Sequence, residues 1–96
     1  MNQQVAIAIW NDRPCLHIVW IEPWGEDYTM LPKQKLVVTT TGPDSDSGPW
    51  FALVETEGNT QVYVERGAYP QVEVDGVPVE CGHNRQAAQA AGVWRE

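Results

Sequence analysis

The two cysteines and the two histidines of this chain occur as two pairs with the same spacing, Cys15-Leu16-His17 and Cys81-Gly82-His83. On a β-strand, residues two apart project from the same face, so each pair would present a thiol beside an imidazole. Two such pairs brought together would supply the Cys₂His₂ ligand set that suits tetrahedral zinc. One functional hypothesis is therefore a zinc site formed by Cys15, His17, Cys81 and His83.

The other interpretation of these residues is structural. The spacing differs from the CxxC knuckles of zinc fingers and ribbons, and Cys15 and His17 lie in an apolar segment, where a thiol is commonly a small buried side chain. Two cysteines are also too few for the disulfide framework of a small secreted domain. We therefore expect no cofactor, and zinc binding is the alternative.

A second group of candidates follows the same segment, in the sequence Glu22-Pro23-Trp24-Gly25-Glu26-Asp27-Tyr28. Aromatic faces next to carboxylates can hold sugars or quaternary ammonium groups. We take Trp24, Glu26, Tyr28 and the loop-flanking Trp50 as candidate binding residues. For the five tryptophans as a set, the interpretation we favour is that they fill a small core, because each buries a large area; Trp24 and Trp50 are the expected exceptions.

Catalytic motifs are missing from the sequence. It contains no nucleophile elbow, phosphate-binding loop or zincin motif. His83 could polarise a group, and Glu22, Glu26 and Asp27 could supply an acid and a base, but such carboxylates are usually solvated. We therefore expect a protein that is not an enzyme, with a small hydrolase as a further alternative.

The charge of the chain limits its partners. Thirteen acidic and six basic side chains give a formal net charge of −7, and nucleic-acid affinity depends on Lys and Arg neutralising phosphates. We therefore exclude nucleic acid and anionic membranes as partners. The first residues lack the basic region of a signal peptide, and no apolar run is long enough to span a membrane. This pattern predicts a cytoplasmic location.

The strands predicted to position these residues are short and rich in β-branched residues. Residues 15–22 are apolar on both faces, which is typical of a central strand covered on both sides. Further strands are expected at residues 5–10, 28–31 and 36–41. Gly42-Pro43 to Gly48-Pro49 brackets a polar stretch that predicts a mobile loop.

Two hairpins follow this loop. Residues 50–55 and 60–66 flank Gly58-Asn59, and a pairing of Glu57 with Thr60 would place Phe51, Leu53, Val62 and Val64 on one side. In residues 71–80, Asp75-Gly76 predicts a two-residue turn that pairs Val72 with Val79 and Val74 with Val77. Pro78 cannot donate to a ladder, so its strand should be an edge.

The pattern changes near the end of the chain. Residues 84–91 consist of good helix formers after Asn84, a potential N-cap, and they end before Gly92. Val93 and Trp94 are the apolar residues by which this short helix could dock. The 96 residues predict a single all-β domain spanning residues 1–96. Its expected fold is a small antiparallel sandwich or partly open barrel of six to seven strands with a short C-terminal helix.

The segment EPWG, its continuation GEDYTMLPKQKLVVT, and the later VDGVPVECGHNR resemble a group of small uncharacterised bacterial proteins of one all-β domain. This chain departs from that group at Lys33-Gln34, where a glycine is usual. The resemblance implies bacterial origin and a compact β fold, and it implies no activity. The leading hypothesis is a small binding or protein-interaction module. Its partner would be a protein, a small ligand or a second copy, contacted through an aromatic patch or the edge near Pro78.

Overall fold

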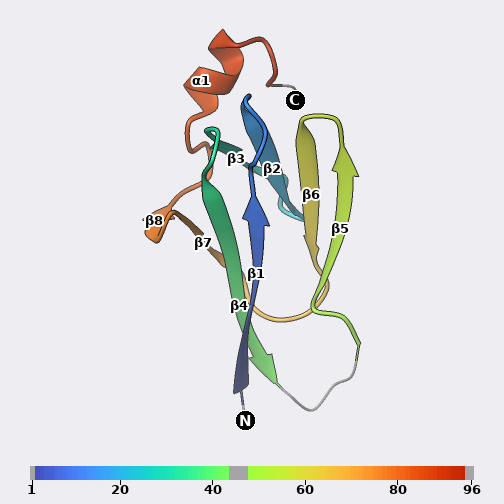
Figure 1. Cartoon of the computed structure of the whole chain (residues 1–96). Coiled ribbons are helices and arrows are strands. Elements are labelled where there is room, and N and C mark those ends of the chain that lie inside the picture. Colours follow the sequence, from blue (N-terminus) through green and yellow to red (C-terminus); the bar gives the residue numbers. More distant parts are fainter. Residues whose placement is uncertain (1, 44–47, 95–96) are drawn as a thin grey trace.

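The computed structural model describes residues 2–43 and 48–94. These residues form eight strands in two stacked sheets and one short helix (Figure 1). The first sheet has the order β1-β4-β7-β8 and contains β1 (Asn2–Trp10), β4 (Lys35–Pro43), β7 (Gln71–Val74) and β8 (Val77–Val79). The second has the order β3-β2-β6-β5 and contains β2 (His17–Glu22), β3 (Glu26–Met30), β5 (Phe51–Thr56) and β6 (Asn59–Val64).

This arrangement confirms the predicted all-β sandwich with a C-terminal helix, but it has eight strands where six to seven were expected. It also contains one parallel pair, β2 with β6, in a fold predicted to be antiparallel throughout. The cause is topological. After β3 the chain crosses to the first sheet to form β4, and it returns as the β5–β6 hairpin on the far side of β2. Part of the predicted loop, residues 44–47, lies outside the described residues.

The core lies between the sheets and is built from aliphatic side chains. Its fully buried members include Val19 and Ile21 from β2, Leu36 and Val38 from β4, and Val62 from β6. β2 is a central strand, as its two apolar faces predict. Burying one such side chain stabilises the fold by about 1.5–3 kcal/mol.

The prediction that tryptophans fill the core is wrong, because none of the five is fully buried. Aliphatic side chains fill the space between the sheets, and the five indoles are partly or largely exposed. Two of them, Trp20 and Trp94, donate hydrogen bonds from their N–H groups. Trp20, for example, donates from Nε1 to Oδ1 of Asn59 at 3.0 Å.

The two predicted hairpins have different outcomes. The register around Asp75-Gly76 is confirmed, with Val72 opposite Val79 and Val74 opposite Val77, and both turn residues have positive φ (52° and 82°) as the turn requires. The β5–β6 turn is instead centred on Glu57-Gly58, so Leu53 faces Val62. The predicted turn was centred one residue too late in the chain, so each predicted partner on β6 was wrong by two residues. A shift of two residues still keeps the same side chains on each face.

Two further local features differ from expectation. The helix α1 spans Arg85–Ala90, close to the predicted 84–91, but Asn84 has φ 55° and makes no side-chain cap. Its amide Nδ2 donates instead to the carbonyl of Thr29. In the β3–β4 turn, Lys33 has φ 72°, a left-handed conformation that favours glycine.

The remaining segment, residues 80–94, closes one side of the sandwich. The amide of Gly82 donates to the carbonyl of Asp27 at 2.8 Å, and the amide of Thr29 donates to the carbonyl of His83 at 2.9 Å. These bonds bring the chain after β8 against β3, so β3 and β8 lie on one flank, which we call the β3–β8 flank. The opposite flank contains the other terminal strands of the two sheets and is called the β1–β5 flank (Figure 1).

Within residues 2–43 and 48–94, no helix has the length and apolarity needed to span a bilayer.

Candidate binding groove

An open groove of about 540 Å³ runs along the β3–β8 flank. Tyr28 from β3 forms part of its floor, and Tyr69 and Pro70 enter it just before β7. Glu73 in β7 and residues 78–81 around β8 complete the wall. The groove therefore combines aromatic, aliphatic and acidic side chains from both sheets.

Glu26 organises the aromatic end of the groove. The hydroxyl of Tyr69 donates to its two carboxylate oxygens at 2.5 and 2.6 Å, and the hydroxyl of Tyr28 donates to Oε1 at 3.3 Å. The ring of Trp24 meets Tyr69 edge-on, with centroids 5.1 Å apart. Three sequence-predicted binding residues, Trp24, Glu26 and Tyr28, therefore lie together.

Both tyrosine hydroxyls keep their protons at neutral pH. The hydrogen bond to the Glu26 carboxylate is the main cause that raises the pKa of Tyr69 to about 12. Burial, followed by the charge of Glu26, raises the pKa of Tyr28. These hydroxyls act as hydrogen-bond donors, because a phenol with such a pKa is a poor base near pH 7.

Trp50, the fourth predicted binding residue, lies apart from this group. Its ring packs over Gly42 and Gly67, where an added Cβ would lie within 3.3 Å of the ring. The guanidinium of Arg66 lies over the Trp50 ring, with its carbon atom 4.1 Å from the ring centroid. These contacts give Trp50 a structural role that fastens the segment before β7 to β4.

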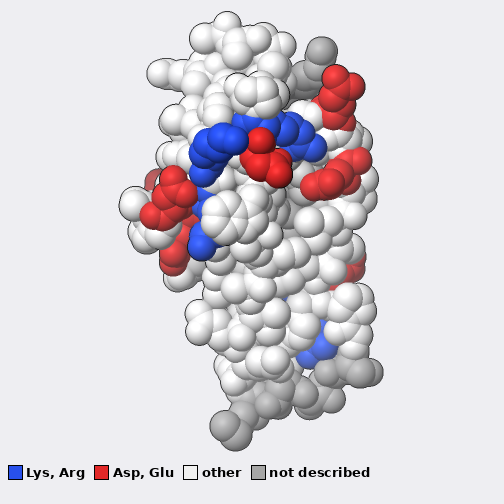
Figure 2. Space-filling model, in the orientation of Figure 1, with Lys and Arg blue, Asp and Glu red and all other residues white. Residues whose placement is uncertain are grey.

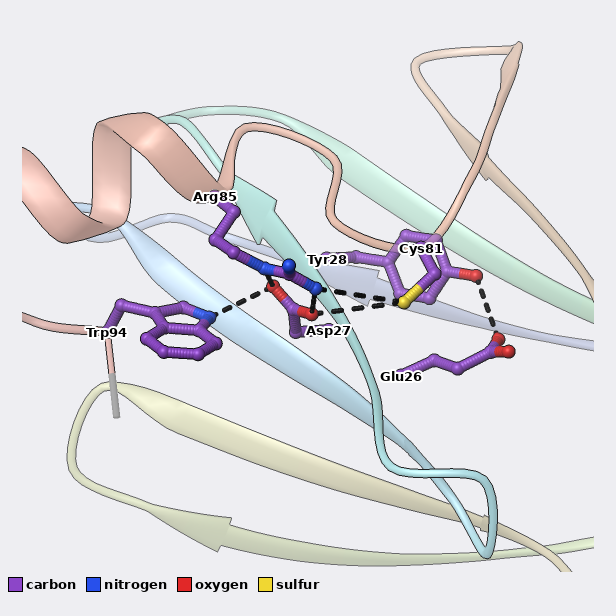
Figure 3. A network of polar contacts seen from close by, with 6 residues as sticks. All are labelled: Glu26, Asp27, Tyr28, Cys81, Arg85 and Trp94. Atoms are coloured by element: carbon purple, nitrogen blue, oxygen red, sulfur yellow. Dashed lines mark hydrogen bonds and ion pairs between the residues drawn. The ribbon is translucent and has the colours of Figure 1, made fainter. Parts of the chain in front are cut away.

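Beneath the groove, the buried carboxylate of Asp27 is the centre of a polar network (Figure 3). Arg85 donates to both carboxylate oxygens, from Nε at 2.9 Å to Oδ2 and from Nη2 to Oδ1. Trp94 donates to Oδ2 from Nε1 at 3.0 Å. Burial alone would raise the pKa of Asp27, but the Arg85 and Trp94 hydrogen bonds outweigh it and lower that pKa.

This network fastens the C-terminal segment to β3. Trp94 also packs against Trp20, with ring centroids 6.1 Å apart, so the helix docks through Trp94, where the sequence left docking and fraying as alternatives. Sequence reasoning did not identify the network, or Tyr69 as a groove residue. The aromatic residue in the loop RGAYP was the one sequence feature that could have identified Tyr69 as a binding residue. The partners of Asp27 could not be found from a local pattern, because they lie 58 and 67 positions away in the sequence.

The four residues proposed for zinc do not form one group. Within the described part of the chain, the hydrogen-bond partners of the His17 ring are Arg13 and Thr60, whereas Cys81 lies 3.9 Å from both Asp27 and Arg85. Cys15 and Cys81 are both exposed. Among the residues that the structure describes, no three His, Cys, Asp or Glu side chains gather in a way that could hold a metal. Zinc binding stays a prediction without a gathered ligand set.

The buried imidazole of His17 has a different role. Arg13 lies 2.9 Å from Nδ1, and Thr60 Oγ1 lies 2.7 Å from Nε2. A guanidinium can only donate, so Nδ1 is the acceptor and Nε2–H donates to Thr60. Burial and the positive charge of Arg13 lower the pKa of His17, and both ring nitrogens of this neutral imidazole are occupied.

Comparisons with protein-family models, with curated proteins and with solved structures found no match.

Proposed function

We propose that this protein is a non-catalytic interaction module that binds a basic, extended segment of a partner protein in the β3–β8 groove. The observation that carries the proposal is the composition of the groove wall. Tyrosines, prolines, valines and the carboxylates of Glu73 and Glu80 line it, and none of the described residues lining it is Lys or Arg. Such a surface favours a ligand with positive charge and apolar groups.

The charges near the groove support this ligand class. Arg85 is committed to the buried Asp27 through two hydrogen bonds, and none of the described residues that line the groove beside Glu73 and Glu80 is a cation. The chain as a whole carries a formal charge of −7. A lysine or arginine side chain entering the groove would therefore meet carboxylates without a competing protein cation.

The aromatic end supports the same ligand. Trp24 and Tyr69 are 42% and 57% exposed, although their rings contact each other and Tyr69 is anchored by Glu26. Exposed aromatic faces held rigid by neighbours attract ammonium and guanidinium groups, with about 0.5–1 kcal/mol for each such contact at exposed sites. Ordering these rings on binding would cost little, because they are already held in place.

The groove should engage side chains more than backbone. β8 is three residues long and contains Pro78, which has no N–H to offer an added strand. A partner segment would therefore lie across the groove, with its cationic groups on the carboxylates and its apolar groups on Pro70 and Val79.

The probe for this proposal is a short acetylated peptide in which lysine and valine alternate. Its affinity, measured by calorimetry at low salt, should fall about fivefold in the Glu73→Gln/Glu80→Gln variant, because two exposed charge contacts are lost. The matched control is Glu57→Gln/Glu65→Gln, which removes the same charge from exposed positions elsewhere and should change the affinity less than about twofold.

Equal weakening by both double variants would mean that the peptide responds only to net charge, and the groove would not be the site. Absence of measurable binding to the wild-type protein would also contradict the proposal.

A further inference from the structure

We infer that this chain forms a two-fold symmetric homodimer in which the β1 strands of two copies pair antiparallel and join their first sheets. β1 is the last strand of its sheet, and within the described residues its only strand partner is β4. The nine residues of β1, NQQVAIAIW, contain no charged residue, no proline and no glycine. A long uncharged edge of this kind is a template for another strand.

The other sheet edges carry features that oppose such pairing. β8 is short and contains Pro78. β3 is bridged by His83 at Tyr28 and begins with Glu26 and Asp27. β5 carries Glu55. Charges, prolines and covering segments are the means by which proteins protect sheet edges, and β1 has none of them.

An apolar side chain of the β1–β5 flank is also incompletely covered. In Figure 1, β5 lies beyond β1 at the side of the molecule, and no strand of the first sheet lies in front of it. Leu53 of β5 is paired with the core residue Val62 and shares its face, yet it is 43% exposed. A strand added beside β1 would extend the first sheet toward this uncovered apolar side chain.

A second copy of the chain fits this edge because β1 is complementary to itself. Centred on Ile7, an antiparallel pair would place Ile7 opposite its symmetry mate and Val5 opposite Ile9, on the face where Ile7 and Ile9 pack against the core. On the outer face it would place Ala6 opposite Ala8 and Gln4 opposite Trp10, which is 64% exposed. Self-pairing of this kind gives the isologous interface typical of two-fold dimers.

The negative net charge of the chain also favours β1 as the strand that pairs between two copies. Each copy carries −7, so two copies repel unless their contact avoids carboxylates. β1 is the one edge strand of reasonable length among the described residues where symmetric pairing places no acidic side chain at the interface. The partner in this dimer lies on the β1–β5 flank, so the proposed groove on the β3–β8 flank would stay open.

The test uses two double variants of the exposed outer positions. Ala6→Glu/Ala8→Glu would place like charges directly opposite each other in both symmetry-related pairs, and Ala6→Glu/Ala8→Lys would place opposite charges there. Sedimentation velocity over a range of concentrations should show a wild-type dimer, at least about a tenfold higher dissociation constant for the first variant, and recovery of the dimer in the second. Thermal unfolding of a dilute, monomeric sample of each variant confirms that it folds.

A wild-type protein that stays monomeric at all concentrations would overturn the inference. The inference would also be overturned if both variants kept the dimer, or if both lost it while folding normally. Either result would mean that dimerisation does not depend on the predicted pairing of Ala6 with Ala8.

Discussion

The two flanks of this sandwich carry opposite kinds of chemistry. The β3–β8 flank contains the aromatic pair Trp24–Tyr69. On the same flank, Asp27 of β3 accepts a hydrogen bond from Trp94 and so holds the C-terminal segment against β3. The β1–β5 flank presents an uncharged nine-residue edge and a half-exposed Leu53. Among the coloured residues of the visible face in Figure 2, the charged side chains lie mainly over the upper half, and a single blue patch lies in the lower part.

This difference indicates two kinds of contact. Carboxylates and anchored rings select a charged ligand by side-chain recognition, whereas an open strand edge selects another strand by backbone hydrogen bonds. The buried polar groups differ in the same way. On one side Asp27 is kept ionised by Arg85 and Trp94, and toward β5 the imidazole of His17 is kept neutral by burial.

The largest expected effect comes from breaking the network of the β3–β8 flank. Asp27→Asn should reduce the free energy of unfolding by about 2–3 kcal/mol, because it replaces a buried carboxylate that accepts charge-assisted hydrogen bonds. Chemical denaturation at neutral pH measures this loss. The matched control is Asp12→Asn, a change at an exposed carboxylate, which should stay within about 0.5 kcal/mol.

Acid gives an independent check of the same network. The pKa of Asp27 is lowered in the folded protein, so its stabilisation is fully present above the unfolded value of about 3.9 and is lost as the pH falls through the lower folded value. The stability gap between wild type and Asp27→Asn should therefore shrink below about pH 4. A gap that stays constant down to the acid transition would contradict this role.

A smaller, separate pH effect should come from His17. Its pKa is lowered in the folded state, so the unfolded chain binds the proton more tightly, and stability falls as the pH drops below about 6.5. Denaturation at about pH 7.5 and about pH 5.5 should show this loss in the wild type and much less of it in His17→Gln. His83 is present in both proteins, so their difference isolates His17; identical pH dependences would refute the buried neutral imidazole.

The smallest expected effect on stability tests whether the aromatic pair serves binding. Trp24→Ala should reduce the free energy of unfolding by less than about 1 kcal/mol, since the indole is half-exposed and loses one ring contact. The same change should weaken binding of the lysine–valine peptide. Trp10→Ala, an exposed tryptophan on the other sheet, should leave that affinity unchanged. A loss of more than about 2 kcal/mol would instead make Trp24 part of the packed structure.

Local patterns predicted much of the fold. Asp75-Gly76 specified its hairpin to the exact residue pairs, because both positions need positive φ and the flanking valines alternate. The apolar faces of residues 17–22 predicted a central strand. The parallel pairing of β2 with β6 was not predictable, because it depends on where the chain returns after crossing between sheets.

The candidate site was predicted in part. Trp24, Glu26 and Tyr28 are neighbours in sequence, and a tight turn at Gly25, with φ 68°, keeps them near one another. Cys81 and Arg85 join them through the docking of the chain after β8 on β3, and Tyr69 joins them from the segment before β7 through its hydrogen bond to Glu26. The equal spacing of the two Cys-X-His pairs does not bring the pairs together, because spacing sets which face a residue occupies, whereas long-range packing sets which faces meet.

The central claim, that the β3–β8 groove is the binding surface, is tested most directly by residue-level mapping. A ¹⁵N-labelled sample titrated with the lysine–valine peptide should show amide shifts concentrated at Tyr69, Gln71, Glu73 and residues 79–81, and the matched glutamate–valine peptide should produce none. Shifts concentrated on β1 and β5, or equal shifts with both peptides, would contradict the account.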